Sequence, residues 1–89
     1  MYTGIVQGLE QVIEIRKGDG FITLLVSDQH GFFADVFIGA SVAVNGVCLT
    51  VTTIDRAQKQ IHFDISNVTL ALTTLKALKI GDEVNIERS

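Results

Sequence analysis

Apolar positions alternate with small polar ones on both sides of an Asn-Gly pair near the middle of the chain. The stretch SVAVNGVCLTV covers residues 41–51, with the pair at Asn45 and Gly46. Asn-Gly between two alternating apolar runs is the strongest short-range signal for a two-residue hairpin turn. The turn predicts four cross-strand pairs, which are Val44 with Val47, Ala43 with Cys48, Val42 with Leu49, and Ser41 with Thr50.

Strand side chains point alternately to two faces, so this register sorts the hairpin into two sets. The apolar set, expected to face the core, is Val42, Val44, Val47, Leu49 and Val51. The opposite set is small or uncharged and comprises Ser41, Ala43, Cys48 and Thr50. A solvated sheet face is the ordinary interpretation, but such a face normally also carries Lys, Glu or Arg. Hydroxyls form hydrogen bonds without the desolvation cost of charges, so this face also suits a flat, neutral small molecule with hydroxyl groups.

The rest of the chain predicts further short strands separated by glycine and polar turns. Strands are expected in the opening segments YTGIVQG and EQVIEIRK, in FITLLVS, in a second hairpin within residues 51–66, and after the Gly81-Asp82 turn. The segment 28–40 is expected to be irregular, with Phe32, Phe33 and Phe37 closing one end of the core.

The pattern changes to a helical period at residue 66. The segment SNVTLALTTLKALK has Ser66 or Asn67 as a candidate N-cap. Its apolar stripe is Val68, Leu72, Leu75 and Leu78. Several threonines lower helix propensity, so the helix is expected to be short. Six strands and one short helix predict an all-β closed barrel, because closure removes the unpaired edges that a small sheet exposes.

Length, charge and cysteine content narrow the class of protein. The 89 residues, 47% of them hydrophobic, are expected to form a single domain spanning 1–89. The net charge is −3 and the seven basic residues are scattered, so nucleic acid is not an expected partner. No apolar run approaches the ~18 residues that span a membrane, and MYTGIVQG lacks the basic region of a signal peptide. The single cysteine fits a reducing compartment, so a cytoplasmic location is expected.

Cys48 is a candidate nucleophile only if a base or a cation lies beside its thiol. Nothing in the sequence places His30 or His62, its two histidines, next to Cys48, so a small apolar role is the simpler interpretation. One cysteine and two histidines without short spacing predict no metal site. Asp64 and Ser66 share the outward face of their strand with His62. An ordinary solvent-exposed strand face accounts for these polar residues as well as ligand binding does.

Four segments of the chain, taken in order, resemble the N-terminal barrel of the riboflavin synthase family and its lumazine-binding relatives. They are MYTGIVQG, GASVAVNGVCLTV, FDIS and GDEVNIER, and the resemblance extends over essentially the whole chain. It implies a six-stranded Greek-key barrel that binds 6,7-dimethyl-8-ribityllumazine or riboflavin and requires no external cofactor. In the family two barrels of neighbouring subunits share one active site, so the resemblance also implies a homodimer or pairing with a second barrel.

The resemblance further implies a set of ligand-binding positions. The ligand of the neighbouring barrel would be approached by Gly4, Ile5 and Val6. The ring and the ribityl group would be lined by Cys48, Leu49 and Thr50, with Ser41 close by. Ser41 and Cys48 are also the candidate catalytic residues. The rim that receives the ribityl chain and the ring edge would be formed by Asp64, Ile65, Ser66, Asn67, Val68 and Thr69.

The implied reaction belongs to riboflavin biosynthesis. One lumazine gives a four-carbon unit to another, which yields riboflavin and 5-amino-6-ribitylamino-uracil. The sequence differs from the family pattern in two ways, since Val68 stands where an acidic residue is expected and one barrel stands where the enzyme has two. Three roles therefore remain open: a binding domain of synthase type, an active synthase domain working as a homo-oligomer, and a carrier or antenna protein that holds a lumazine or flavin without converting it.

Overall fold

The Asn-Gly hairpin forms with the predicted register. The computed structural model describes residues 6–88, and in it strand β3 (Ser41–Val44) pairs with β4 (Val47–Asp55). All four expected cross-strand pairs are present. Asn45 and Gly46 have positive φ angles of 49° and 81°, and a type I′ turn requires positive φ at both central residues. The sequence of the turn therefore sets the register of this hairpin.

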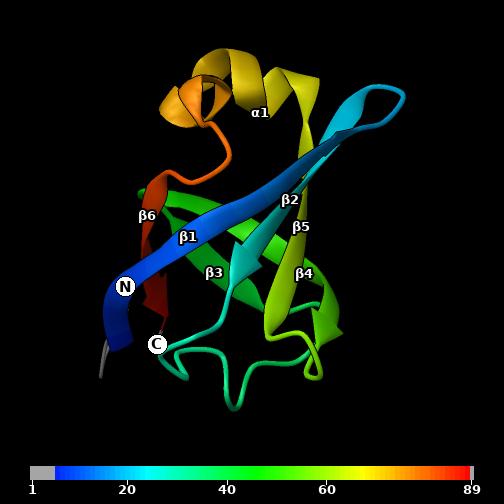
Figure 1. Cartoon of the computed structure of the whole chain (residues 1–89). Coiled ribbons are helices and arrows are strands. Elements are labelled where there is room, and N and C mark those ends of the chain that lie inside the picture. Colours follow the sequence, from blue (N-terminus) through cyan, green and yellow to red (C-terminus); the bar gives the residue numbers. More distant parts are fainter. Residues whose placement is uncertain (1–5, 89) are drawn as a thin grey trace.

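Six antiparallel strands close into a barrel (Figure 1). Besides β3 and β4 they are β1 (Val6–Lys17), β2 (Phe21–Ser27), β5 (Gln60–Ser66) and β6 (Glu83–Arg88). Their order around the barrel is β1-β2-β5-β4-β3-β6. Strand β5 therefore lies between β2 and β4, and the chain crosses one end of the barrel between β2 and β3. This Greek-key order confirms the prediction of an all-β, six-stranded closed barrel with one short helix.

Strand β1 joins the two opening segments that the sequence predicts as separate strands. Gly8 and Leu9 remain in the ladder with β6, so no break occurs between the segments. The second half of β1 pairs with β2 instead, beginning at Val12 and with a register shift between Val12 and Glu14. Such a bulge bends a strand and increases its twist. The bend allows the long strand β1 to pair with β6 along its first half and with β2 along its second half.

The barrel interior holds one apolar core, to which every strand contributes. Its buried members are Val12, Leu24, Val26, Phe33, Val36, Val42, Val44, Leu49, Val51, Ile61, Phe63, Ile65, Leu75, Val84 and Ile86. The apolar face predicted for the hairpin lies in this core, with only Val47 half-buried. The alternation of β5 is also as predicted, because Ile61, Phe63 and Ile65 point inward.

The helical segment consists of two short pieces that lie over one end of the barrel (Figure 1). The first is the α-helix α1 (Asn67–Leu72), and the second is the 3-10 helix η1 (Thr74–Ala77). Ser66 is the N-cap, since its Oγ accepts a hydrogen bond from the Thr69 N–H at 3.2 Å. A cap of this kind satisfies one of the free N–H groups of the first turn.

The predicted apolar stripe of this segment is wrong in its first half. Leu75 is buried and Leu78 is half-buried, but Val68 and Leu72 are 69% and 80% exposed. The cause is Thr73, whose extended backbone (φ −131°, ψ 172°) ends α1 and caps η1. One helical period therefore does not continue through both pieces, and α1 has no buried residue.

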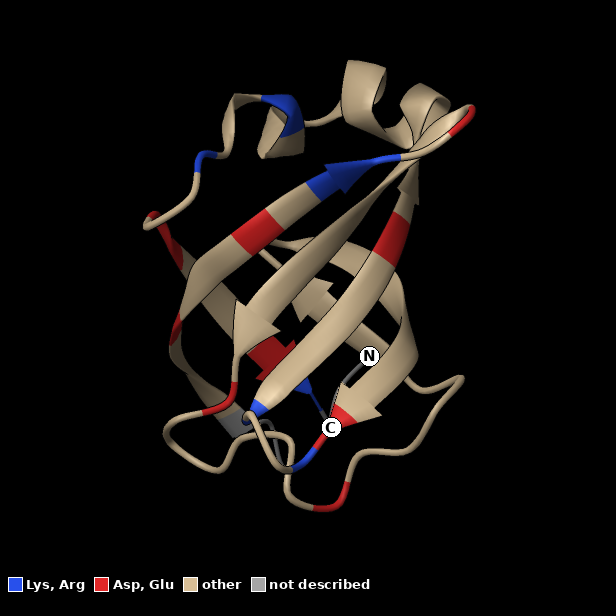
Figure 2. Cartoon of the chain, turned by 45° about the vertical axis from the view of Figure 1, so that its right-hand side comes forward, with Lys and Arg blue, Asp and Glu red and all other residues tan. Residues whose placement is uncertain are grey.

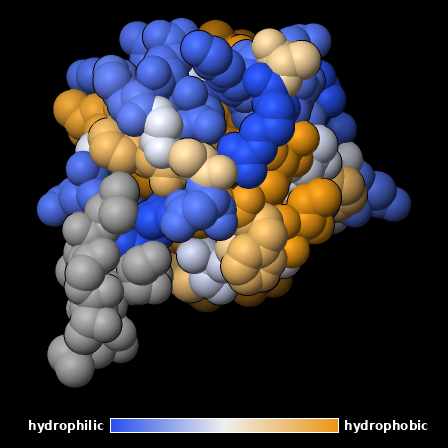
Figure 3. Space-filling view, turned by 90° about the horizontal axis from the view of Figure 1, so that it is seen from below, coloured by the Kyte–Doolittle hydropathy of each residue, from blue (hydrophilic) through white to orange (hydrophobic). Residues whose placement is uncertain are grey.

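The irregular segment 28–40 closes the opposite end of the barrel (Figure 1). Phe33 is fully buried. The Arg56 guanidinium donates hydrogen bonds to the carbonyl oxygens of Phe33 and Val36, at 2.9 and 3.0 Å. The prediction that Phe37 joins the aromatic cluster is wrong, because Val36 takes the inward position and Phe37 is 68% exposed. Figure 3 looks onto this end, where hydrophobic surface lies beside hydrophilic surface.

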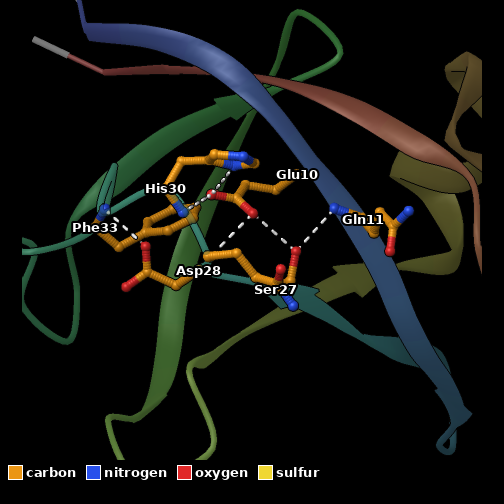
Figure 4. A network of polar contacts seen from close by, with 7 residues as sticks. Glu10, Gln11, Ser27, Asp28, His30 and Phe33 are labelled. Carbon is orange, nitrogen blue, oxygen red and sulfur yellow. Dashed lines mark hydrogen bonds and ion pairs between the residues drawn. The ribbon is translucent and has the colours of Figure 1, made fainter.

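A buried carboxylate ties the same segment to the barrel (Figure 4). Glu10 of β1 is 2% exposed and accepts hydrogen bonds from Ser27 Oγ at 2.8 Å and from the backbone N–H groups of Gln29 and His30 at 3.1 Å each. Ser27 Oγ also accepts a hydrogen bond from the Gln11 N–H at 2.9 Å. A buried carboxylate needs several donors to offset its desolvation, and here they come from β2 and the loop.

Charged side chains are spread over the surface of the described residues. In Figure 2 neither Lys and Arg nor Asp and Glu gather on one face of the part of the chain that is drawn in colour. Across residues 6–88, no helix has the length and apolar character needed to cross a membrane.

Candidate functional site

The hairpin β3–β4 supplies the first part of the candidate site on its outer face. Ser41 and Thr50 lie opposite each other, and both are exposed. One step along, Ala43 lies opposite Cys48, whose thiol is exposed. Ala43 itself is buried, because it lies between Cys48 on β4 and Glu87 on β6. This part of the surface therefore carries two hydroxyls and a thiol over small side chains.

The same outer face continues onto β5. Val51 of β4 pairs with Phe63 of β5, and both side chains point into the core. Thr50 precedes Val51 and Asp64 follows Phe63, and both of these residues are exposed on the outside of the barrel. The Asp64 carboxylate therefore joins the surface that Thr50 begins.

Strand β2 adds a residue that the sequence analysis missed. Thr23 lies opposite Asp64 in the β2–β5 ladder, and its Oγ1 donates a hydrogen bond to Asp64 Oδ1 at 2.8 Å. The only local signal was an outward-facing threonine between two apolar residues, which many strands contain. The pairing of β2 with β5 could not be read from the sequence. We call the surface formed by Ser41, Cys48, Thr50, Asp64, Ser66 and Thr23 the candidate face.

The start of α1 lies at the end of this face. Ser66 pairs with Phe21 of β2, and its hydroxyl bonds both the N–H and the Oγ1 of Thr69, at 3.2 and 3.1 Å. The Ser66 hydroxyl is thus used to start the helix. Asn67 and Val68 follow on the exposed first turn. The predicted rim residues are therefore adjacent, and the Ser66 cap holds them at the junction of β5 and α1.

Two of the predicted ligand-binding residues point away from the candidate face. Leu49 and Ile65 are 5% and 1% exposed, and their side chains lie in the core. Alternation along β4 and β5 requires this, because their neighbours Thr50 and Asp64 point outward. Any contact that Leu49 or Ile65 makes with a ligand on this face is through the backbone.

The predicted residues at the N-terminus cannot be placed on this face. Gly4 and Ile5 lie outside the described residues. Val6 is the first residue of β1 and lies opposite Arg88 of β6. Within residues 6–88, the candidate face as defined above is built from β2, β3, β4 and β5.

The polar groups of the face can bind and orient a ligand, but they do not form a nucleophile–base pair. Among residues 6–88, no hydrogen bond or ion pair joins Cys48 or Ser41 to a histidine. His30 instead lies beside Glu10 in the closing loop, with 3.4 Å between Nδ1 and Oε2, and His62 lies opposite Thr53. In the described part of the chain no three His, Cys, Asp or Glu side chains are grouped as metal ligands.

Comparison with known proteins places the chain in a family. The family model of the Lumazine binding domain matches residues 3–89. Over 89 residues, all of this chain, identity is 46% with the riboflavin synthase of Buchnera aphidicola subsp. Schizaphis graminum and 43% with that of Escherichia coli. It is 35% with the riboflavin synthase of Bacillus subtilis. The matched regions are 42%, 41% and 40% of those proteins, so the chain spans about two fifths of the length of these curated relatives.

Proposed function

The chain belongs to the lumazine-binding domain family, and on that premise we propose that it binds 6,7-dimethyl-8-ribityllumazine or riboflavin on the candidate face. Family membership supports the class of ligand. The observation that supports the location is the line of polar side chains across four strands, which runs from Ser41 and Thr50 to the hydrogen-bonded pair of Asp64 and Thr23. A ribityl chain is a polyol, and a polyol needs a line of donors and acceptors of this kind.

The two parts of the ligand fit different parts of the face. The ribityl hydroxyls bond Thr50 and the free oxygen of Asp64, because Thr23 engages only Oδ1 of that carboxylate. The flat ring lies over the small side chains of Ala43 and Cys48, with Glu87 of β6 beside Ala43. The exposed Val68 on the first turn of α1 lies at the rim, beyond the ring edge.

The reaction that this binding serves is the riboflavin synthase reaction, the transfer of a four-carbon unit between two bound lumazines. The curated relatives are named riboflavin synthases, which favours this role over a carrier or antenna protein. Ser41 and Cys48 have no histidine partner within residues 6–88, so the main contribution of the barrel is to hold and orient its lumazine. Orientation of two reactants can contribute ~7–11 kcal/mol to a rate enhancement.

One barrel offers one candidate face, whereas the reaction consumes two lumazines. A second barrel must therefore face the first. It is either another copy of this chain or a different barrel domain. Two identical barrels form a two-fold contact in which each presents the same surface. Such a pair binds ligand well and catalyses poorly, since identical barrels do not differentiate the donor lumazine from the acceptor. Sedimentation velocity with riboflavin present tests this pairing, and a 9.7 kDa monomer at micromolar concentration contradicts it.

A fluorescence titration tests the binding site. Riboflavin is expected to bind the wild-type chain, and lumiflavin, which lacks the ribityl chain, is expected to bind much more weakly. Thr50→Val is expected to weaken riboflavin binding about fivefold, because one hydrogen bond is worth about 1 kcal/mol. Thr53→Val is the matched control, since Thr53 is exposed on the same strand but beyond the candidate face. Equal affinity for the two flavins, or equal loss in both variants, contradicts the proposal.

A further inference from the structure

A cleft lies at the helical end of the barrel. A cleft of about 400 Å³ separates the β1–β2 hairpin from α1 and η1. Its apolar lining comprises Ile15, Ile22, Leu70, Leu75 and Leu78, and its two remaining lining residues are Lys17 and Lys76. Clefts of about 300–1,000 Å³ that are mostly apolar and have a few placed polar groups are typical small-molecule sites.

This cleft is separate from the candidate face. Ile22 packs against the barrel core and lines the cleft, whereas the next residue, Thr23, bonds Asp64 on the outer face. Successive residues of a strand point to opposite sides. The two sites therefore lie on opposite sides of β2, and the inference drawn for the cleft does not depend on the proposed function.

The charge of the cleft selects its ligand. Both Lys17 and Lys76 are exposed, and neither forms an ion pair with another residue in the range 6–88. None of the residues that line the cleft is acidic. Two free ammonium groups beside an apolar surface attract a negative group that is attached to an apolar body. This local positive charge stands out in a chain whose net charge is −3.

The two pieces that cover the cleft pack to different extents. Helix α1 has no buried residue, and Leu70 is its one contribution to the lining of the cleft. The neighbouring η1 is held more firmly, because Leu75 is buried in the core. Leu70 is therefore the one side chain through which α1 would contact a ligand in the cleft.

From this combination we propose that the cleft binds a small anionic amphiphile, a molecule with an apolar chain and a single carboxylate. The chain lies along Ile15, Ile22 and Leu70, and the carboxylate lies between Lys17 and Lys76. Affinity then increases with chain length, by up to about fourfold for each added methylene that is buried, as the transfer free energy of one methylene requires.

Calorimetric titration of the full chain with octanoate and decanoate, below their micelle concentrations, tests this proposal. We expect saturable binding of one carboxylate per chain, with decanoate binding more tightly than octanoate. Decyltrimethylammonium has a similar apolar chain with the opposite charge and is expected not to bind. No saturable binding of decanoate, or equal binding of the cationic compound, overturns the proposal.

Charge-matched variants locate the site. Lys17→Met and Lys76→Met are each expected to weaken decanoate binding at least threefold, and Lys79→Met, which removes the same charge just outside the cleft, is expected to leave it unchanged. Three equal affinities overturn the proposal. So does displacement of decanoate by riboflavin, which would place both ligands on one site. The proposal is also overturned if the wild-type chain does not bind decanoate while the Lys17 and Lys76 variants differ from it in sedimentation coefficient. That result would indicate that a second copy of the chain covers the cleft.

Discussion

Thr23 of β2 donates a hydrogen bond from Oγ1 to Asp64 Oδ1 of β5 over 2.8 Å, and the two residues are direct partners in the β2–β5 ladder. The bond fixes the orientation of an exposed carboxylate whose second oxygen stays available. A carboxylate held in one orientation loses less side-chain entropy when it binds a hydroxyl group. Thr23 is thus a positioning residue for the proposed ribityl site.

Replacement of Thr23 tests this role. Thr23→Val keeps the shape and strand propensity of the side chain but removes the donor, and we expect it to weaken riboflavin binding about three- to tenfold, as the loss of about 1 kcal/mol requires. Thr23→Ser keeps the hydroxyl and is expected to restore most of the affinity. Fluorescence titration measures both. If the Thr23→Val and Thr23→Ser variants bind riboflavin equally, the hydrogen bond does not position Asp64 for the ligand.

The sequence predicted the turn of the hairpin, but it did not predict a pairing between distant strands or a break within the helical segment. The hairpin register followed from Asn45 and Gly46, because a two-residue turn fixes which residues face each other. The pairing of Thr23 with Asp64 joins strands 41 residues apart, and no local signal encodes it. The break at Thr73 was also missed, since the apolar period continues through it although its backbone is extended.

The buried Glu10 is expected to control the stability of the barrel. Glu10→Gln replaces the oxygen that accepts the His30 N–H with an amide nitrogen and should lower the free energy of unfolding by about 1–3 kcal/mol, the cost of a buried unpaired donor. Glu10→Ala leaves the Ser27 hydroxyl and the Gln29 N–H without this acceptor as well and should cost more. Urea denaturation measures both variants. Values within about 0.5 kcal/mol of wild type would show that water replaces the carboxylate.

The Asp28 carboxyl is expected to make stability depend on pH. Burial raises the pKa of Asp28 above the ordinary 3.8, and the Glu10 carboxylate raises it further, whereas the Phe33 N–H and the cations Arg56 and Lys59 lower it. A carboxyl with a raised folded-state pKa binds its proton more tightly when folded, so its contribution to stability grows as the pH falls through that pKa.

Asp28→Asn removes this titration while keeping an oxygen that can accept from the Phe33 N–H. Relative to wild type, the variant should be more stable at pH 7 than at pH 4, as urea denaturation at both pH values will show. Asp19→Asn in the exposed β1–β2 turn controls for the loss of one negative charge. The opposite sign, with the variant gaining relative stability as the pH falls, would contradict the raised pKa.

Gly8 is expected to be required because an aromatic ring occupies the place of its side chain. A Cβ added at Gly8 would lie 1.8 Å from Cζ of Phe32, whose ring packs against the core. Gly8→Ala should therefore lower the free energy of unfolding by about 1–3 kcal/mol through overpacking. In a Phe32→Ala background the same change should cost clearly less, and a thermal or urea double-mutant cycle measures the difference. Additive costs would show that the ring moves aside freely.

Val68 is expected to limit catalysis without being needed for the fold. The family resemblance implies an acidic residue at this position, and Val68 could be explained as part of an apolar helix face. The structure removes that explanation, because Val68 is 69% exposed and α1 buries none of its residues. The first turn of α1 also holds no acidic residue, and a carboxylate there is stabilised by the helix dipole by about 0.3–1 kcal/mol.

Val68→Glu should therefore fold at least as well as wild type and place a carboxylate at the rim of the candidate face. If a carboxylate there takes part in proton transfer, the variant should raise the rate of riboflavin formation from the lumazine several-fold and change riboflavin affinity by less than twofold. Leu72→Glu adds the same charge at an exposed position in the last turn of α1 and should leave the rate unchanged. Steady-state assays of riboflavin formation by the wild type, Val68→Glu and Leu72→Glu at equal concentration test this prediction. An equal rise in both variants would indicate a general charge effect, and no rise in Val68→Glu would show that the acidic residue of the family is dispensable for turnover.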